Sequence, residues 1–353
     1  MMHLLPRRQP VRRAGFRAAL LLFVAAACSD STTEPPPPPV TGEITVDASA
    51  SPAYVRLGDP SVAVTVSDPS TSTEWDLALF ATSVTVNGGA AGPGGATAWC
   101  VCGNEDATVA QLQAMTPANQ LAVFEAVTAA DVPTATEFEA DALNPVINGW
   151  FTGTAGSTAA VSTRSWIIRR TTGGVILGKF RVTGVSATAS GVNSVTVEYA
   201  IQLTAGAAFG ATESRTLDLS AGAVYLDIAS GPVAATTHWD LRFSGYEIRI
   251  NGGVSGSGGV SAVVDETMPF SQMTAQYASF APPVAYRGDA YGGVFVSSPW
   301  YRYNITGTDN QIWPNFNVYL IRRGDTVDKV QLIGYYGATG TPRQITVRSS
   351  RVQ

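Results

Sequence analysis

The sequence predicts an all-β protein made of two tandem, homologous modules of antiparallel, sandwich-like sheet, with a minor helical part. Short segments alternate polar and apolar residues, as strands with one buried face do. The 353 residues include 35 glycines, with many Thr, Val and Ser, which favours strands and tight turns over helices. The same motifs also return in the same order in the second half of the chain.

The N-terminus has the pattern of a secretory signal peptide, predicted over residues 1–27. A basic opening is followed by an apolar run from Ala18 to Ala27. The run is about half the length that a bilayer-spanning helix needs, so a permanent anchor helix is the weaker alternative. The basic residues of the opening are Arg7, Arg8, Arg12, Arg13 and Arg17.

Cys28 is the predicted lipidation site. Val24 to Cys28 reads Val-Ala-Ala-Ala-Cys, which resembles the lipobox of bacterial lipoproteins; the alternative is a plain secretory signal with a chance cysteine. Residues 28–42, with prolines at Pro35–Pro39, are expected to form a semi-rigid tether. Ser29 resembles the residue that directs such proteins to the outer membrane, which implies a lipid-anchored protein on its periplasmic or cell-surface face.

Charge and cysteine content narrow the function classes. From Cys28 onward, 17 Lys and Arg face 27 Asp and Glu, a formal charge of −10, which argues against nucleic acid as a partner. Only Cys100 and Cys102 accompany Cys28, so the chain is no disulfide scaffold. Their Cys-x-Cys spacing leaves two interpretations open, a soft-metal ligand pair and two residues near a turn that are oxidised together.

Two copies of one module occupy residues 43–208 and 209–353, here called module 1 and module 2. The period, roughly 150 to 165 residues, is that of a whole domain and not of a solenoid unit. The matching blocks are Glu74–Phe80 with His238–Phe243, Val84–Gly89 with Ile248–Gly253, Gly94-Gly95 with Gly258-Gly259, Trp166–Arg170 with Tyr319–Arg323, Gly178–Val182 with Asp328–Leu332, and Val195–Val197 with Ile345–Val347.

Within the modules, four alternating segments predict strands and one segment predicts helix. Ala107–Ala126 has an apolar side typical of a helix, which Pro117 should break in two. The Asn-Gly-Gly corners supply residues that tolerate positive φ in turns. The alternating segments are Val195–Tyr199, Glu247–Ile250, Lys329–Leu332 and Ile345–Arg348.

The Trp-Asp-Leu blocks and the arginine pairs each allow a structural and a ligand-binding role. Trp75 and Trp239 are expected in the core, with the following aspartate hydrogen-bonded at a sheet edge. The arginines are expected on solvated strand faces, with bidentate bonds to carboxylates of a ligand as the alternative. These arginines are Arg169, Arg170, Arg322 and Arg323.

Taken in order, these blocks resemble the HmuY family of haem-binding bacterial lipoproteins. The resemblance rests on Trp-Asp-Leu, Asn-Gly-Gly and the ending Tyr319–Tyr336, and it is tightest over residues 213–353. It implies a mostly β protein that captures haem without catalysis and passes it to a TonB-dependent outer-membrane receptor. Its partners would be haem or haem-carrying proteins, and the N-terminal anchor would attach the protein to the lipid bilayer.

The resemblance implies axial ligands from His or Met, and few such residues are present. His238 is the one histidine after the signal peptide, so a bis-His site within one chain is excluded. The remaining candidates are Met115, Met268 and Met273, with gap-filling core packing as the alternative for each. The expected lining of an apolar cleft is Tyr277, Phe280, Tyr286, Tyr291 and Phe295.

Two functions follow as expectations. The first is haem capture in an apolar cleft with Met ligation. The second is a β-rich adhesion or scaffold lipoprotein that keeps the fold without the ligand. No catalytic motif such as Gly-x-Ser-x-Gly and no cluster of metal-ligand residues occurs in the sequence, so an enzyme is not expected.

Overall fold

The computed structural model describes residues 42–153, 160–189 and 191–353, which form 24 strands and four short α-helices. The prediction of an all-β protein is confirmed. The signal peptide, Cys28 and the tether up to residue 41 lie outside the described residues. Among the residues described, none of the helices has the length and apolar character needed to cross a membrane.

Each module contributes twelve strands in the same order. Those of module 1 are β1 (Glu43–Asp47), β2 (Ala53–Arg56), β3 (Val62–Val64), β4 (Leu77–Phe80), β5 (Ser83–Val86), β6 (Thr97–Cys100), β7 (Ala142–Asn144), β8 (Phe151–Thr152), β9 (Ala160–Val161), β10 (Ser165–Arg170), β11 (Ile176–Thr188) and β12 (Gly191–Ile201). Those of module 2 are β13 (Glu213–Asp218), β14 (Val224–Asp227), β15 (Gly231–Val233), β16 (Leu241–Ser244), β17 (Glu247–Ile250), β18 (Val260–Asp265), β19 (Ala290–Gly292), β20 (Tyr301–Tyr303), β21 (Ile312–Pro314), β22 (Val318–Arg323), β23 (Thr326–Tyr336) and β24 (Pro342–Arg351). The four alternating segments all lie in strands, as predicted.

The two five-stranded sheets each combine strands of both modules. One has the order β1-β24-β23-β22-β6 and the other β13-β12-β11-β10-β18. Two four-stranded sheets complete the sandwiches, β3-β2-β4-β5 from module 1 and β15-β14-β16-β17 from module 2. The first half of each module therefore pairs with the second half of the other.

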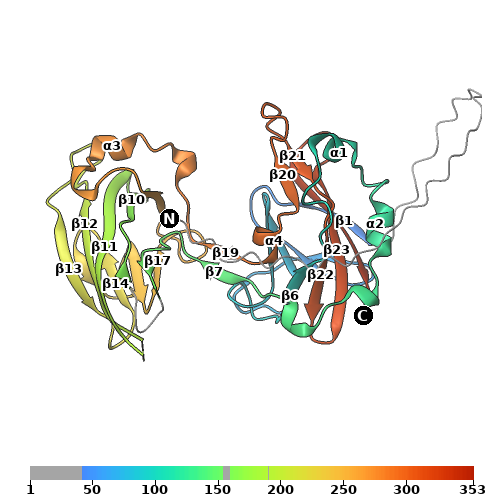
Figure 1. The fold of residues 1–353 in the computed structure, drawn as a ribbon, viewed down its shortest axis with the longest axis horizontal. Coiled ribbons are helices and arrows are strands. Elements are labelled where there is room, and N and C mark those ends of the chain that lie inside the picture. The colour runs from blue at the N-terminus through green and yellow to red at the C-terminus, as the bar shows by residue number, and fades with distance from the viewer. Residues whose placement is uncertain (1–41, 154–159, 190) are drawn as a thin grey trace, which may run out of the picture. The chain divides into compact units, whose positions relative to one another are not determined.

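This exchange defines two lobes. Lobe A consists of residues 43–141 and 293–353, and lobe B of residues 146–289. Figure 1 shows the blue N-terminal and red C-terminal strands together in lobe A, with the yellow strands in lobe B. The predicted boundary between residues 208 and 209 separates the two copies in the sequence, but it falls inside lobe B.

The chain crosses between the lobes twice, and the two crossings pair with each other. Strands β7 and β19 form a two-stranded antiparallel ribbon with Leu143 opposite Tyr291. These strands hold the same place in their modules, so the ribbon pairs the repeat with itself. It is the arrangement of a domain-swapped dimer in which both copies belong to one chain.

Each lobe has its own apolar core between its two sheets. In lobe B, Val197 and Trp166 of the larger sheet meet Phe243 and Ile250 of the smaller one, all fully buried. In lobe A, Val347 and Tyr319 meet strands β4 and β5 in the same way. Because burial of one such side chain contributes about 2 kcal/mol, each core is a large stabilising term of its own lobe.

The Asn-Gly-Gly corners tie the tryptophan of each Trp-Asp-Leu block to the turn that follows. Trp75 is buried, as predicted, whereas Trp239 is only half-buried and is not part of the core of lobe B. Asn87 Nδ2 donates to the Trp75 carbonyl at 2.9 Å, and its Oδ1 accepts from Gly94 N at 2.9 Å. Asn251 makes the same bonds to Trp239 and Gly258, at 2.9 and 3.0 Å. The repeated twelve-residue spacing from Trp to Asn thus reflects one hydrogen-bonded unit. A Cβ at Gly94 or Gly258 would collide with the Asn carboxamide.

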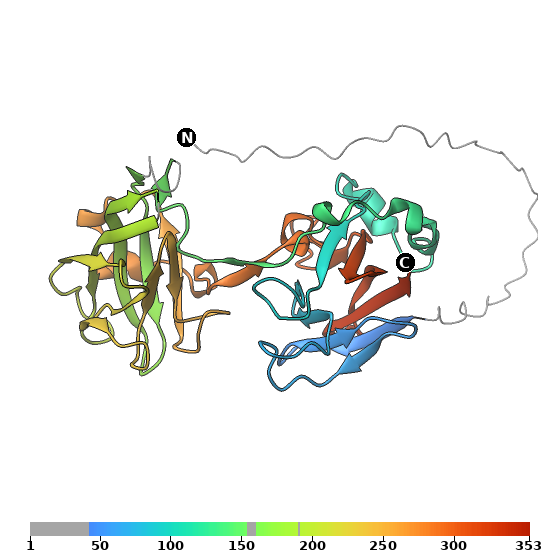
Figure 2. The same cartoon turned by 90° about the horizontal axis from the view of Figure 1, so that it is seen from below.

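A helical segment covers the outer face of each five-stranded sheet. In lobe A it contains α1 (Val109–Ala114), α2 (Leu121–Ala126) and the 3-10 turns Ala129–Asp131 and Ala135–Glu137. The predicted helix is thus confirmed and is broken at 115–120, around Pro117. In lobe B the segment contains the 3-10 turns Phe270–Gln272 and Pro283–Ala285 and helix α3 (Ala275–Ser279). Helix α4 (Val294–Ser297) belongs to lobe A. Figure 2 shows the teal helices of lobe A beside its red strands.

Candidate functional site

The cover segment of lobe B, residues 266–287, holds two of the four predicted haem ligands. Met273, at the end of the first 3-10 turn, is only 2% exposed, whereas Met268 is partly buried. Both belong to one apolar cluster on the outer face of the sheet. The other members are Ile167, Leu177, Phe209, Val263, Tyr277, Ala278, Ala281 and Tyr286. The structure therefore brings the Met268 and Met273 side chains into the same cluster.

Polar contacts at both ends fix this segment. The Asp265 carboxylate, at the end of β18, accepts hydrogen bonds from Met268 N at 3.0 Å and from the Tyr277 hydroxyl at 2.6 Å. These bonds hold the pKa of Asp265 below its usual value against the opposing effect of burial. The Thr274 side chain caps α3 by accepting from Tyr277 N at 3.1 Å.

A buried lysine joins each cover segment to its sheet, a feature that the sequence patterns did not single out. Lys179 Nζ donates to the Phe270 carbonyl at 2.9 Å and lies 4.5 Å from the centre of that ring. Lys329 Nζ donates to the Phe124 carbonyl at 2.9 Å and lies 4.6 Å from the centre of the Phe124 ring. Burial lowers the pKa of both lysines. The signal in the sequence was a lysine at the same place in both copies of the strand.

A shallow hollow of about 490 Å³ opens next to the chain segments of the methionine cluster, with polar and small residues, among them Gln202 and Gln276, in its wall. Thr274 and Ala275, which directly follow Met273, form part of its wall, opposite the loop from Gly206 to Ala208. Leu203 and Phe280 adjoin wall residues along the chain and are 76% and 74% exposed.

The other predicted haem-site residues lie elsewhere. Met115 follows α1 in the cover segment of lobe A, away from the Met268–Met273 cluster. Among the expected lining residues, Tyr286 is in the cluster and Tyr277 is at its edge, but Tyr291 lies in strand β19. Phe295 packs in the core of lobe A, 4.3 Å from the Tyr319 ring. The expectation of one cleft lined by all five aromatic residues is therefore wrong, because the exchange sends their chain segment to different lobes.

His238 belongs to a charged cluster at the Trp-Asp corner of lobe B. Its Nε2 lies 3.4 Å from Asp240 Oδ1, and Arg170 Nη1 lies 3.6 Å from Asp240 Oδ2. The Asp240 carboxylate is fully buried and also accepts from Ile228 N at 3.0 Å. Burial raises its pKa, which these donors oppose. His238 Nε2 also lies 3.4 Å from Arg170 Nη1, and Asp240 Oδ1 has no hydrogen-bond partner among the described residues.

Lobe A has the equivalent corner without the histidine. Arg323 Nη1 donates to Asp76 Oδ1 at 2.7 Å, and Asp76 Oδ2 accepts from Leu57 N at 2.8 Å. Asp76 is buried, which raises its pKa. The second arginine of each pair therefore binds a core aspartate of the other module, a role that neither of the two predicted alternatives described.

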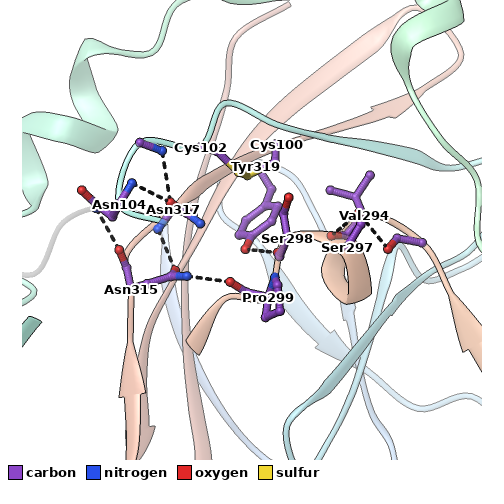
Figure 3. Close-up of a disulfide and its surroundings, with 12 residues drawn as sticks. Cys100, Cys102, Asn104, Val294, Ser297, Ser298, Pro299, Asn315, Asn317 and Tyr319 are labelled. Atoms are coloured by element: carbon purple, nitrogen blue, oxygen red, sulfur yellow. Dashed lines mark hydrogen bonds between the residues drawn. A yellow bond between two sulfur atoms is a disulfide. The ribbon is translucent and has the colours of Figure 1, made fainter. Parts of the chain in front are cut away.

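Cys100 and Cys102 form a disulfide, so the oxidised alternative is the one that the structure supports (Figure 3). Within residues 42–153, 160–189 and 191–353, no group of three or more His, Cys, Asp or Glu is placed to hold a metal ion. The fold and these contacts define a two-lobed antiparallel β protein whose repeated modules exchange halves. A comparison with protein-family models and with curated proteins gives no match.

Proposed function

We propose that this chain is a lipid-anchored, non-catalytic haem-binding protein that captures haem in lobe B for an outer-membrane uptake receptor. The observation that carries the proposal is that Met268 and Met273 lie in one apolar, aromatic-lined cluster beside an open hollow. Thioethers are established axial ligands of haem iron. The sequence resemblance supplies the ligand class, and Cys28 supplies the anchor.

The surroundings of the cluster suit the rest of a haem molecule. Tyr277, Tyr286 and Phe209 offer flat apolar surface. The Arg169 guanidinium lies 5.7 Å from the centre of the Tyr286 ring, so a cation borders the cluster. A propionate is the kind of group that an arginine binds through paired hydrogen bonds.

Haem access to Met273 requires the cover segment to rise from the sheet, because this side chain is only 2% exposed. The segment has little of its own secondary structure, with one five-residue α-helix and two 3-10 turns. Short elements held by few bonds open at low free-energy cost compared with the core sheet. The bonds that would break first are those of Lys179 and Asp265 to this segment.

The test is a haem titration of the chain from Gly42 onward, followed by absorbance with the iron oxidised and reduced. We expect saturable binding of one haem per chain, and spectra that change in Met268→Ala and Met273→Ala. Met115→Ala, in the cover segment of lobe A, is the matched control and should leave the spectra unchanged. Binding that is unaltered by the lobe B variants would refute the proposed ligands.

The burial of Met273 favours a second candidate function. A methionine packed against a sheet stabilises the cover segment and needs no ligand. The protein would then display two rigid β lobes at the membrane as an adhesion or scaffold protein. Flat or unsaturable absorbance in the same titration, with Met273→Ala lowering the stability of lobe B, would support this function in place of haem capture.

A further inference from the structure

The disulfide of lobe A sits at a corner where β6 meets the cover segment. Cys100 is the last residue of β6, and Cys102 follows one residue later; both side chains are partly exposed. Cys102 has φ +42°, a left-handed conformation that is uncommon for a residue with a side chain. The bond thus joins two half-buried cysteines across a single intervening residue. Cys100 packs against the core of lobe A, and Cys102 has a costly backbone conformation.

Lobe B forms the same corner without a disulfide. Tyr319 pairs with Cys100 in one lobe and Trp166 pairs with Val264 in the other, which makes Val264 and Glu266 the counterparts of Cys100 and Cys102. There the Asp265 carboxylate holds the turn by accepting from Thr267 N at 2.8 Å and from Met268 N. The module therefore reaches this corner without a covalent bond.

The disulfide also contributes little as a structural staple. A disulfide stabilises mainly by restricting the unfolded chain, and that effect is smallest for the shortest loops. Here the sequence separation is two residues. Strained or exposed disulfides have more oxidising potentials than structural ones and are readily reduced. Both considerations suit a bond that is made and broken in the native protein.

The surrounding side chains hold the corner in place independently of the sulfur atoms. Asn317 Oδ1 accepts from Gly103 N at 3.3 Å and from Asn104 N at 3.2 Å. Asn104 Nδ2 in turn donates to the Asn315 carbonyl at 2.8 Å. Figure 3 shows these asparagines beside the disulfide.

We propose that Cys100 and Cys102 form a redox-active site that exchanges with an external dithiol. A thiolate of the dithiol attacks Cys102 Sγ, which breaks the internal bond and releases Cys100 as a thiolate that takes up a proton. The second thiol of the partner then attacks the mixed disulfide and frees Cys102. The chain gains two electrons and two protons, and the dithiol leaves as its own disulfide.

The test uses the chain from Gly42 onward, in which these are the only two cysteines, with dithiothreitol as the dithiol. Thiols are counted by alkylation and mass spectrometry, and hydrogen exchange follows β6 and β22. We expect two thiols to appear without urea, at a rate within about tenfold of the rate in urea, while both strands stay protected. Asn317→Ala should remove protection at 103–104 in the reduced protein, whereas wild type keeps it.

Cys100→Ser/Cys102→Ser is the control variant and should show the exchange pattern of the reduced protein. A disulfide that is reduced only after unfolding would overturn the proposal, and so would loss of protection throughout lobe A on reduction, because either result identifies a structural staple. Haem binding in lobe B is measured separately, so neither outcome depends on it.

Discussion

Lobes A and B contain the same module fold but differ in how the chain passes through them. Lobe B is continuous from residue 146 to 289, whereas lobe A is assembled from both ends of the described chain, with Glu43 paired to Arg348. The pairings β11–β12 and β23–β24 are nevertheless equivalent, down to a register shift at the same point near Gly184 and Gly334. The sheet geometry thus depends on side-chain pattern and packing, and not on the order of connection.

The cover segments show the opposite behaviour, since they share a position and have diverged in chemistry. Residues 103–140 of lobe A include six acidic residues and no basic one. Residues 267–288 of lobe B include a single charged residue, Arg287. Exposed Phe280 and Val284, at 74% and 75%, lie in the second segment. The shared part is the lysine beneath each segment. The sheet and its lysine are thus common to both lobes, whereas the outer surfaces of the two cover segments differ.

The largest expected effect tests whether the lobes unfold separately. Val347 and Val197 hold equivalent, fully buried positions in the two cores. An aspartate there buries an unpaired charge, which should destabilise the affected lobe by about 4 kcal/mol or more. Hydrogen exchange should show Val347→Asp exposing both ends of the chain and sparing 146–289, with Val197→Asp doing the reverse. Equal loss in both lobes from either variant would show one cooperative unit.

The free energy of unfolding should depend on pH by up to about 3 kcal/mol through Asp141, the residue before strand β7, where the chain first crosses between the lobes. Burial raises its pKa to about 6, although Val86 N donates to it at 2.8 Å. A raised pKa favours folding when the group is protonated, so its contribution is complete below pH 4 and is lost as the pH rises through 6. The stability of Asp141→Asn relative to wild type, from urea unfolding, should therefore increase over this range. Glu139→Gln, on an exposed neighbour, should show no such trend.

The buried ion pairs should differ in strength between the lobes. Arg323→Ala leaves Asp76 without its 2.7 Å partner and should cost lobe A about 2 kcal/mol, a figure reduced for the partial exposure of the arginine. Arg170→Ala should cost lobe B about 1 kcal/mol, since its distance to Asp240 is 3.6 Å and His238 remains. Arg322→Ala is the control. Equal losses in lobe-resolved denaturation would contradict this ranking.

The smallest expected effects concern the helix caps of the two cover segments. The Thr108 side chain caps α1 together with Gln111, and the Thr274 side chain caps α3. Each change to alanine should cost about 1 kcal/mol. It should speed hydrogen exchange only in its own cover segment. An effect that spreads into the sheet would mean that these segments are not independent of the lobe core.

The sequence allowed prediction of what depends on local pattern. Alternation located β12, β17, β23 and β24, and the repeat indicated the duplicated module. Pro117 correctly divided the helical segment between α1 and α2. Such features depend on residues close in sequence, whose periodicity and backbone preferences are readable from one chain.

The exchange of halves between the modules was not predictable, because strand pairing within one module and strand pairing between the modules satisfy the same sequence pattern. Strand β6 has equivalent partners in β10 and β22, and no local signal distinguishes Trp166 from Tyr319 as the neighbour of Cys100. The candidate site was affected in the same way. Met268 and Met273 were named as candidate ligands, and their side chains share one cluster. Tyr291 and Phe295 were assigned to the same cleft only because they follow in sequence. Lys179 and Lys329 were overlooked because a strand lysine is usually solvated.

The pairing of β1 with β24 also determines the order in which the protein can fold as it is made. Lobe B has all its strands once residue 289 has been synthesised, and its pairing of β10 with β18 joins Ser165 to Asp265, 100 residues apart. Strands β2, β3, β4 and β5 pair among themselves, whereas β1 and β6 reach their partners β24 and β22 only when Val318–Arg351 have been made. Contacts between such distant segments form slowly. Strands β1 and β6 therefore lack their sheet partners until β22 and β24 have been synthesised, and their backbone N–H and C=O groups are open to wrong pairing until then.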